Sequence, residues 1–147
     1  MKTLLTIILL LTFGAGVWGN TAEQIAKFRE AAENGNASVQ WLLAYAYKDG
    51  DGVPKDEKES IKWYRKAAEQ GHADAQYNLG FFYYNGDGVP ESYVQTYAWW
   101  NIAAANGNED SKELKTELAA KMTKEQILEA QKLSREMIKA NPKLMGE

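Results

Sequence analysis

Apolar side chains recur along much of the chain at the spacing of an α-helix. Within residues 37–49, five of them stand at i, i+3, i+4, i+7 and i+8: Val39, Leu42, Leu43, Ala46 and Tyr47. Such positions form one stripe of a helix and do not share one face of a strand. Residues 73–85 carry the equivalent stripe: Ala75, Asn78, Leu79, Phe82 and Tyr83. The pattern predicts an all-α fold.

Pairs of polar residues three positions apart indicate where the helices begin. Four pairs have the spacing of a capping box, in which each side chain bonds the other residue's backbone N–H: Asn20 with Glu23, Asp56 with Glu59, Ser92 with Gln95, and Thr123 with Gln126. Combined with the apolar stripes, these starts predict seven helices: residues 21–34, 37–49, 56–70, 73–85, 92–106, 109–121 and 123–141.

The chain repeats itself with a period of 36 residues (86 − 50), since "GDGVP" at residues 50–54 returns at residues 86–90. With the same shift, "EAAENGNA" aligns with "KAAEQGHA", and Trp63 aligns with Trp99. Stacked helical hairpins produce a period of this length. We therefore expect a short α-solenoid of antiparallel helical hairpins over residues 20–108, with two full repeats and a leading helix. Because a solenoid needs an atypical end, residues 109–147 are predicted to form capping helices.

The repeated GDGVP stretch could be a calcium loop, a phosphate-binding loop or a turn. In a calcium loop counted from Asp49, an oxygen ligand and a glycine belong where Val53 and Pro54 stand. A phosphate-binding loop needs Lys beside Ser or Thr at the start of the next helix, and neither copy has this pair. A turn explains each residue, because Gly50 and Gly86 permit a left-handed helix end and the proline stops the helix. We interpret the stretch as a turn.

Two long segments, "LAYAYKDGDGVPKDEKESIKWYRKAAEQGHADAQ" and "LGFFYYNGDGVPESYVQTYAWWNIAAANGN", resemble the Sel1-like repeat (SLR), a relative of the tetratricopeptide repeat (TPR). The resemblance covers about residues 23–107 and implies a TPR-like scaffold for protein complexes, in bacteria often in envelope assembly, signalling or host contact. Ala44 replaces the usual Gly of the family, and Ser60 and Thr96 replace the usual Ala. All three are small, so we expect close helix packing to survive.

The N-terminal stretch "MKTLLTIILLLTFGAGVWGN" has the order of a secretory signal: one Lys, an apolar run over residues 4–13, and then small residues. That run is shorter than the ~20 residues needed to span a bilayer. We predict a signal peptide over residues 1–19, cleaved after Gly19, and a periplasmic or secreted product. The alternative is an uncleaved anchor that reaches Trp18. The chain has no Cys, which excludes a lipid-anchored lipoprotein.

Charge and residue usage exclude several classes of partner and cofactor. Without Lys2, 16 basic and 20 acidic residues leave a formal charge of −4, and no basic cluster exists. This argues against nucleic acid and, after signal removal, against membrane surfaces. One His, no Cys and scattered carboxylates predict no metal site and no cofactor. We expect a monomer with a protein or peptide partner.

Catalysis has few candidate residues. His72 aligns with Asn36 and Asn108 at the start of a helix, so capping or solvent exposure accounts for it better than catalysis. Some cysteine-rich members of the family that the chain resembles are linked to penicillin hydrolysis. A serine acylating site needs Ser-x-x-Lys on one helical turn, and no serine of the chain has that Lys. We therefore predict no catalytic residue and no enzyme activity.

Trp63, Trp99 and Trp100 could form a sugar-stacking platform or could fill the interior of the hairpins. Two of them keep a fixed place in the repeat beside Ala67 and Ala103. A large ring fills the space that small residues leave, so we favour packing.

A second row of side chains follows the helices at 37–49 and 73–85, opposite the apolar stripe. It recurs at i, i+4 and i+7 and is unusually aromatic: Trp41, Tyr45 and Lys48 in one copy, and Tyr77, Phe81 and Tyr84 in the next, with Asp49 and Asn85 at the rim. The resemblance to TPR solenoids implies that these helices line the concave side. We predict a partner-binding surface here, because Tyr and Trp are common interface anchors. The alternative is that the rings pack on the neighbouring hairpin.

Together these observations predict an exported, non-enzymatic adaptor or scaffold that binds its partner through a concave helical surface. Two alternatives stay open: a cell-envelope inhibitor or immunity-type binder, and a β-lactam or cell-wall hydrolase.

Overall fold

The computed structural model describes residues 20–146, and the predicted signal peptide lies outside them. The described part of the chain is helical: α2 (Ala22–Glu33), α3 (Ala37–Asp49), α4 (Glu57–Ala68), α5 (Ala73–Asn85), α6 (Tyr93–Ala105), α7 (Glu109–Ala119), α8 (Lys124–Ala140) and a 3₁₀ helix, η1 (Pro142–Met145). All seven predicted helices are present, with ends within two residues of the predicted ones. The all-α prediction is confirmed.

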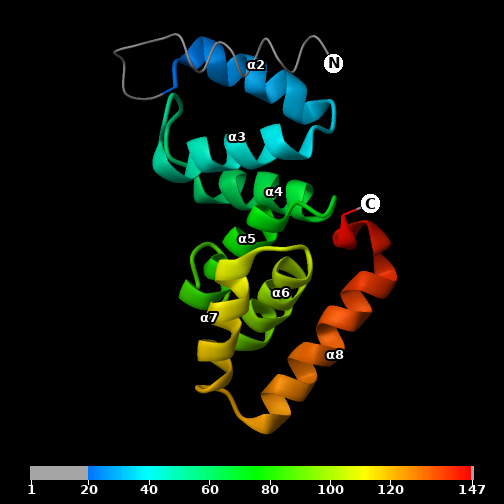
Figure 1. Ribbon diagram of the computed structural model, residues 1–147. Helices are drawn as coiled ribbons and strands as arrows, with labels where there is room; N and C mark the ends of the chain where they lie inside the picture. Colours follow the sequence, from blue (N-terminus) through cyan, green and yellow to red (C-terminus); the bar gives the residue numbers. More distant parts are fainter. Residues whose placement is uncertain (1–19, 147) are drawn as a thin grey trace.

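Consecutive helices pack against one another, from α2 on α3 through to α5 on α6, and Figure 1 shows them stacked in chain order. This arrangement confirms the short solenoid of helical hairpins. Both α7 and α8 pack on α6. Helix α8 then runs back along the stack, and the chain ends beside α4, where the Asn141 side chain donates a hydrogen bond to the Glu69 carbonyl (2.9 Å).

Side-chain oxygens cap the helix starts, with one correction to the sequence analysis. Asp56 and Ser92 accept hydrogen bonds from the backbone N–H three residues on, but only Thr21 and Thr123 complete the reciprocal capping box. The predicted pair of Asn20 and Glu23 was wrong by one residue, because Thr21 caps α2 with Gln24. Asn20 is free for another partner, Asp51.

Both GDGVP stretches are turns. Gly50 and Gly86 end α3 and α5 in the left-handed conformation, with φ of 74° and 72°, which confirms the interpretation from the sequence. The second glycine of the first copy has a further role. A Cβ atom on Gly52 would lie 2.5 Å from the Asn20 carbonyl oxygen, so only glycine lets the chain before α2 approach this turn.

The three tryptophans of α4 and α6 are buried, with exposed fractions of 3% for Trp63, 4% for Trp99 and 2% for Trp100. The packing prediction is confirmed, and a sugar platform on these rings is excluded by their burial. A Cβ atom on Gly80 would overlap the Trp100 indole. In the preceding repeat the same positions hold Ala44 and Tyr64, both fully buried. The smaller ring of Tyr64 leaves room for the Ala44 methyl group.

The C-terminal segment closes one edge of the stack. Leu144 of η1 is buried in the main core, and its carbonyl accepts hydrogen bonds from Gln76 Nε2 (2.8 Å) and Asn106 Nδ2 (2.6 Å). Gly71 allows Gly146 to pass close by, since any side chain at residue 71 would overlap it. The last residues are therefore fixed to the turns that end the first and the second repeat, at Gly71 and Asn106.

Candidate functional site

A cleft of ≈ 270 Å³ lies between α3 and α5. Four of the predicted site residues line it: Lys48, Tyr77, Phe81 and Asn85. Asn78, Phe82 and Asp87 complete its wall. The cleft therefore combines aromatic rings with amide and charged groups, as side-chain-binding pockets commonly do.

Tyr77 and Phe81 form the aromatic wall, and both rings are held in place by their neighbours. They meet edge to face with centroids 5.0 Å apart, and Phe81 meets Trp100 in the same manner at 5.2 Å. The Trp100 indole N–H donates to the Tyr77 carbonyl oxygen (3.1 Å). Both rings remain partly exposed, so they serve the core and the cleft at once. Such a wall needs little reorganisation to receive a partner.

Trp41 and Tyr45 lie beside the cleft on α3. The Trp41 indole N–H donates to Asn78 Oδ1 (2.9 Å), and its ring stacks on the His72 imidazole at 5.7 Å. Tyr45 is 46% exposed and is the most accessible of the predicted aromatic residues. The Asp49 carboxylate accepts a hydrogen bond from the Tyr45 hydroxyl and raises the pKa of that phenol. Trp41 is thus fixed and Tyr45 is open to solvent.

Tyr84 lies in the packing between α5 and α6 and does not line the cleft. Its ring stacks on Tyr93 at 5.6 Å and on Trp100 at 5.9 Å. Its hydroxyl oxygen accepts a hydrogen bond from Lys121 Nζ (3.2 Å). Tyr84 is therefore a poorer candidate for direct contact than Tyr77 or Phe81.

The sequence reasoning missed the continuation of this surface onto α7. Residues 113 and 117 stand 36 positions after Tyr77 and Phe81, and both are glutamates. We define the A face as this equivalent row on three helices: Trp41, Tyr45 and Lys48 of α3; Tyr77, Phe81 and Tyr84 of α5; and Glu113 and Glu117 of α7. The repeat period would have identified the two glutamates.

His72 has the capping role that the sequence predicted. Its Nδ1 accepts the backbone N–H of Ala75 (3.3 Å) at the start of α5. Burial lowers the pKa of the imidazole, and the nearby Asp74 carboxylate opposes that shift only partly.

Within residues 20–146, no three His, Cys, Asp or Glu side chains gather in a way that could hold a metal ion. In the same residues no helix is both long and apolar enough to cross a membrane.

The family model of the Sel1 repeat matches residues 37–72 and 73–108, which are the hairpins α3–α4 and α5–α6. The chain belongs to the Sel1-like repeat proteins. Sel1 repeats generally mediate protein–protein interactions. This assignment agrees with a cleft that lies between α3 and α5, the first helices of the two matched repeats.

Two solved structures of Sel1-like repeat proteins are similar to this one. A protective antigen of uropathogenic Escherichia coli strains, with an SLR fold, has 36% sequence identity and a TM-score of 0.82 over 92% of this chain and 30% of its own. A Sel1 repeat protein from Oxalobacter formigenes has 37% identity and a TM-score of 0.62 over 67% of this chain and 40% of its own. The chain thus spans well under half the length of either structure. No curated protein matches it.

Proposed function

We propose that this Sel1-like repeat protein is exported and acts as a non-enzymatic adaptor, with the A face as the concave surface that receives a protein or peptide partner. The observation that carries the proposal is the cleft between the two matched repeats, with Tyr77 and Phe81 on one wall and Lys48 opposite. Aromatic rings beside polar groups provide contact area at low entropic cost.

The size of the A face sets the strength of binding that we expect. A surface on two repeats and α7 can bury about 800 Å² per partner, which is a standard-size interface. Interfaces of that size range from about micromolar affinity to much tighter values, depending on how well a few anchors are packed. The cleft offers such an anchor point, because it has the volume for one large side chain.

The environment of the serines supports a function without acyl-transfer chemistry. Ser60, Ser111 and Ser134 are buried. Ser92 caps α6 through its side-chain oxygen. Ser38 is exposed, but Trp41 stands where an acylating serine would need Lys. No serine among residues 20–146 therefore combines access with a base.

Site-specific photo-crosslinking in bacterial cells that produce and export the protein tests the adaptor proposal. A photoreactive phenylalanine replaces Tyr45 or Asn85, which are exposed beside the cleft, and in control proteins it replaces Lys58 on α4 or Glu129 on α8. We expect the same covalent adduct from positions 45 and 85, which lie at the A face and the adjoining cleft wall, and none from the controls. Equal adducts from all four positions, or none from the A face, would refute a partner site there.

N-terminal sequencing of the protein from the periplasmic fraction tests export, with Asn20 expected as the first residue.

A further inference from the structure

We infer that the partner segment is a basic peptide: an extended stretch with several Lys or Arg residues that inserts one aromatic or large apolar side chain between Tyr77 and Lys48. This inference rests on the adaptor function proposed above and names the chemistry of its partner. Its basis is the distribution of charge around the cleft.

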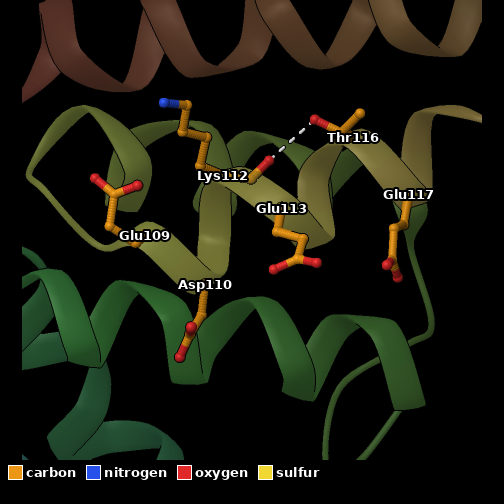
Figure 2. Close-up of a pocket in the computed structure, with 6 residues that line it drawn as sticks. All are labelled: Glu109, Asp110, Lys112, Glu113, Thr116 and Glu117. Carbon is orange, nitrogen blue, oxygen red and sulfur yellow. Dashed lines mark hydrogen bonds between the residues drawn. The ribbon is translucent and has the colours of Figure 1, made fainter.

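Helix α7 lies alongside α5 and extends the A face. Asn108 Nδ2 donates to Asp74 Oδ1 (2.9 Å) at one end, and Lys121 Nζ donates to the Tyr84 hydroxyl (3.2 Å) at the other. Figure 2 shows Asp110, Glu113 and Glu117 extending from α7 on the side of α5, while Lys112 points away. These residues line a shallow hollow on α7. The aromatic wall of the cleft is therefore followed directly by a row of carboxylates.

The carboxylates of this row are accessible to a partner. Asp110, Glu113 and Glu117 are exposed, and none of them forms an ion pair within residues 20–146. The nearby Lys115 is turned to the other side, where its Nζ donates to Asn101 Oδ1 (2.9 Å). A cation on a bound peptide would meet carboxylates without having to displace a lysine.

The acidic row reaches the cleft itself. The negative charges of Asp110 and Asp74 raise the pKa of the Tyr77 hydroxyl, together with the larger effect of its burial. Asp87 lines the other end of the cleft, and Asp49 stands beside Tyr45. Lys48 and Lys121 are the basic groups at this surface, and Lys121 is engaged by Tyr84. Carboxylates therefore outnumber basic groups around the cleft, and a predominantly negative surface attracts positive charge and repels acidic partners.

Selection from a random dodecapeptide library on the immobilised protein tests this inference. We expect enriched peptides that carry a net positive charge and at least one aromatic or large aliphatic residue. Enriched peptides that are neutral or acidic would overturn the basic-peptide inference and leave the adaptor function standing. If no peptide is enriched over the bare support, the result counts against both the basic-peptide inference and the adaptor function. The expected crosslinking from positions 45 and 85 would then uphold the adaptor function and refute only the basic-peptide inference.

Charge-reversal variants then locate the binding. Because exposed ion pairs are individually weak, Glu113→Lys with Glu117→Lys is expected to weaken an enriched peptide about tenfold or more, through lost attraction and added repulsion. Glu113→Gln with Glu117→Gln should weaken it less, and it removes the charge at nearly constant shape. The matched control, Glu125→Lys with Glu129→Lys on exposed positions of α8, should leave the affinity for the peptide within about twofold.

Equal losses of affinity in the two charge-reversed variants would mean non-specific attraction and would overturn the inference. So would a change of oligomeric state in Glu113→Lys with Glu117→Lys, since it would indicate a second copy on this face.

Discussion

Asn20 holds the Asp51 carboxylate at two points: its backbone N–H donates to Oδ1 at 2.6 Å, and its side-chain Nδ2 donates to Oδ2 at 2.7 Å. The pair joins the start of the described chain to the first GDGVP turn, 31 residues further on. Asn20 is also the residue at which the predicted mature protein begins. Its amino group would then approach Asp51 as a cation, which strengthens such a hydrogen bond.

We predict that Asp51→Asn lowers the free energy of unfolding by about 1–3 kcal/mol, because an amide in place of the carboxylate leaves one Asn20 donor without an acceptor. Asp87 is the matched control, since it holds the same position in the second repeat, and within residues 20–146 its side chain accepts one hydrogen bond, from the exposed Asn85 amide (3.1 Å). Asp87→Asn should change the free energy by less than about 0.5 kcal/mol. Urea unfolding of the three proteins measures both values. Equal effects would mean that the Asn20 pair contributes nothing.

Gly80 lets α5 approach the Trp100 indole of α6, since a Cβ atom at residue 80 would overlap that ring. We predict that Gly80→Ala costs about 1–3 kcal/mol despite the higher helix propensity of Ala, because the indole has to move from a packed site. It should also weaken peptide binding, because Trp100 supports Phe81 and Tyr77. Thermal unfolding and tryptophan fluorescence measure the change. The opposite substitution in the first repeat, Ala44→Gly, should cost only about 1 kcal/mol.

Much of the fold was predictable because local and repeat signals agree. The stripe of Leu43 and Tyr47, the 36-residue period and the glycine turns all indicate the same hairpins. The exception at the first helix has a physical cause. Asn20 and Thr21 are both good capping residues, and Asp51, distant in sequence, binds Asn20 and leaves Thr21 to cap.

The candidate site was predictable only in part. Lys48, Tyr77, Phe81 and Asn85 line the cleft as the helical spacing suggested. Tyr84 shares that spacing, but Tyr93 and Trp100 of the next helix stack against it. Spacing along one helix does not reveal which side chains a neighbouring helix covers. The spacing places Asn78 and Phe82 in the apolar stripe, yet both also line the cleft.

His72 is the one histidine of the chain, so near neutral pH its protonation is the side-chain titration that we expect to change the stability. Burial lowers its pKa in the folded state below the ordinary 6.5. A group with a lowered folded pKa adds stability above its unfolded pKa, and that stability is lost as pH falls through the folded pKa. We therefore predict that the free energy of unfolding falls as pH drops below about 6.5. A protonated Nδ1 also cannot accept the Ala75 N–H that it now caps.

The variant His72→Asn isolates this contribution, because Asn36 and Asn108 cap α3 and α7 at the equivalent positions. Urea unfolding at pH 7.5 and at lower pH should show a smaller pH dependence in the variant than in the wild type. Titration of the one imidazole by NMR gives the folded pKa directly. A value at or above 6.5, or an unchanged pH dependence in the variant, would contradict the assignment.

The attachment of the C-terminal segment gives the last prediction, because the repeats supply an internal control. Asn106 donates to Gln76 Oε1 (2.8 Å) and to the Leu144 carbonyl. Gln70, its equivalent in the preceding repeat, donates to Gln40 Oε1 (2.7 Å) and to no residue of the described C-terminal segment, 141–146. Asn106→Ala should cost about 1–3 kcal/mol, because it removes one of the two donors that hold the buried Leu144 carbonyl. Gln70→Ala, at an exposed side chain, should cost less than about 1 kcal/mol.

Trypsin supplies a local measurement of this attachment, since Lys143 is exposed while the next residue is buried. Cleavage after Lys143, followed by mass spectrometry, should accelerate in Asn106→Ala and stay at the wild-type rate in Gln70→Ala. Equal cleavage rates in the two variants would mean that the burial of Leu144 alone holds the segment, without the hydrogen bond from Asn106.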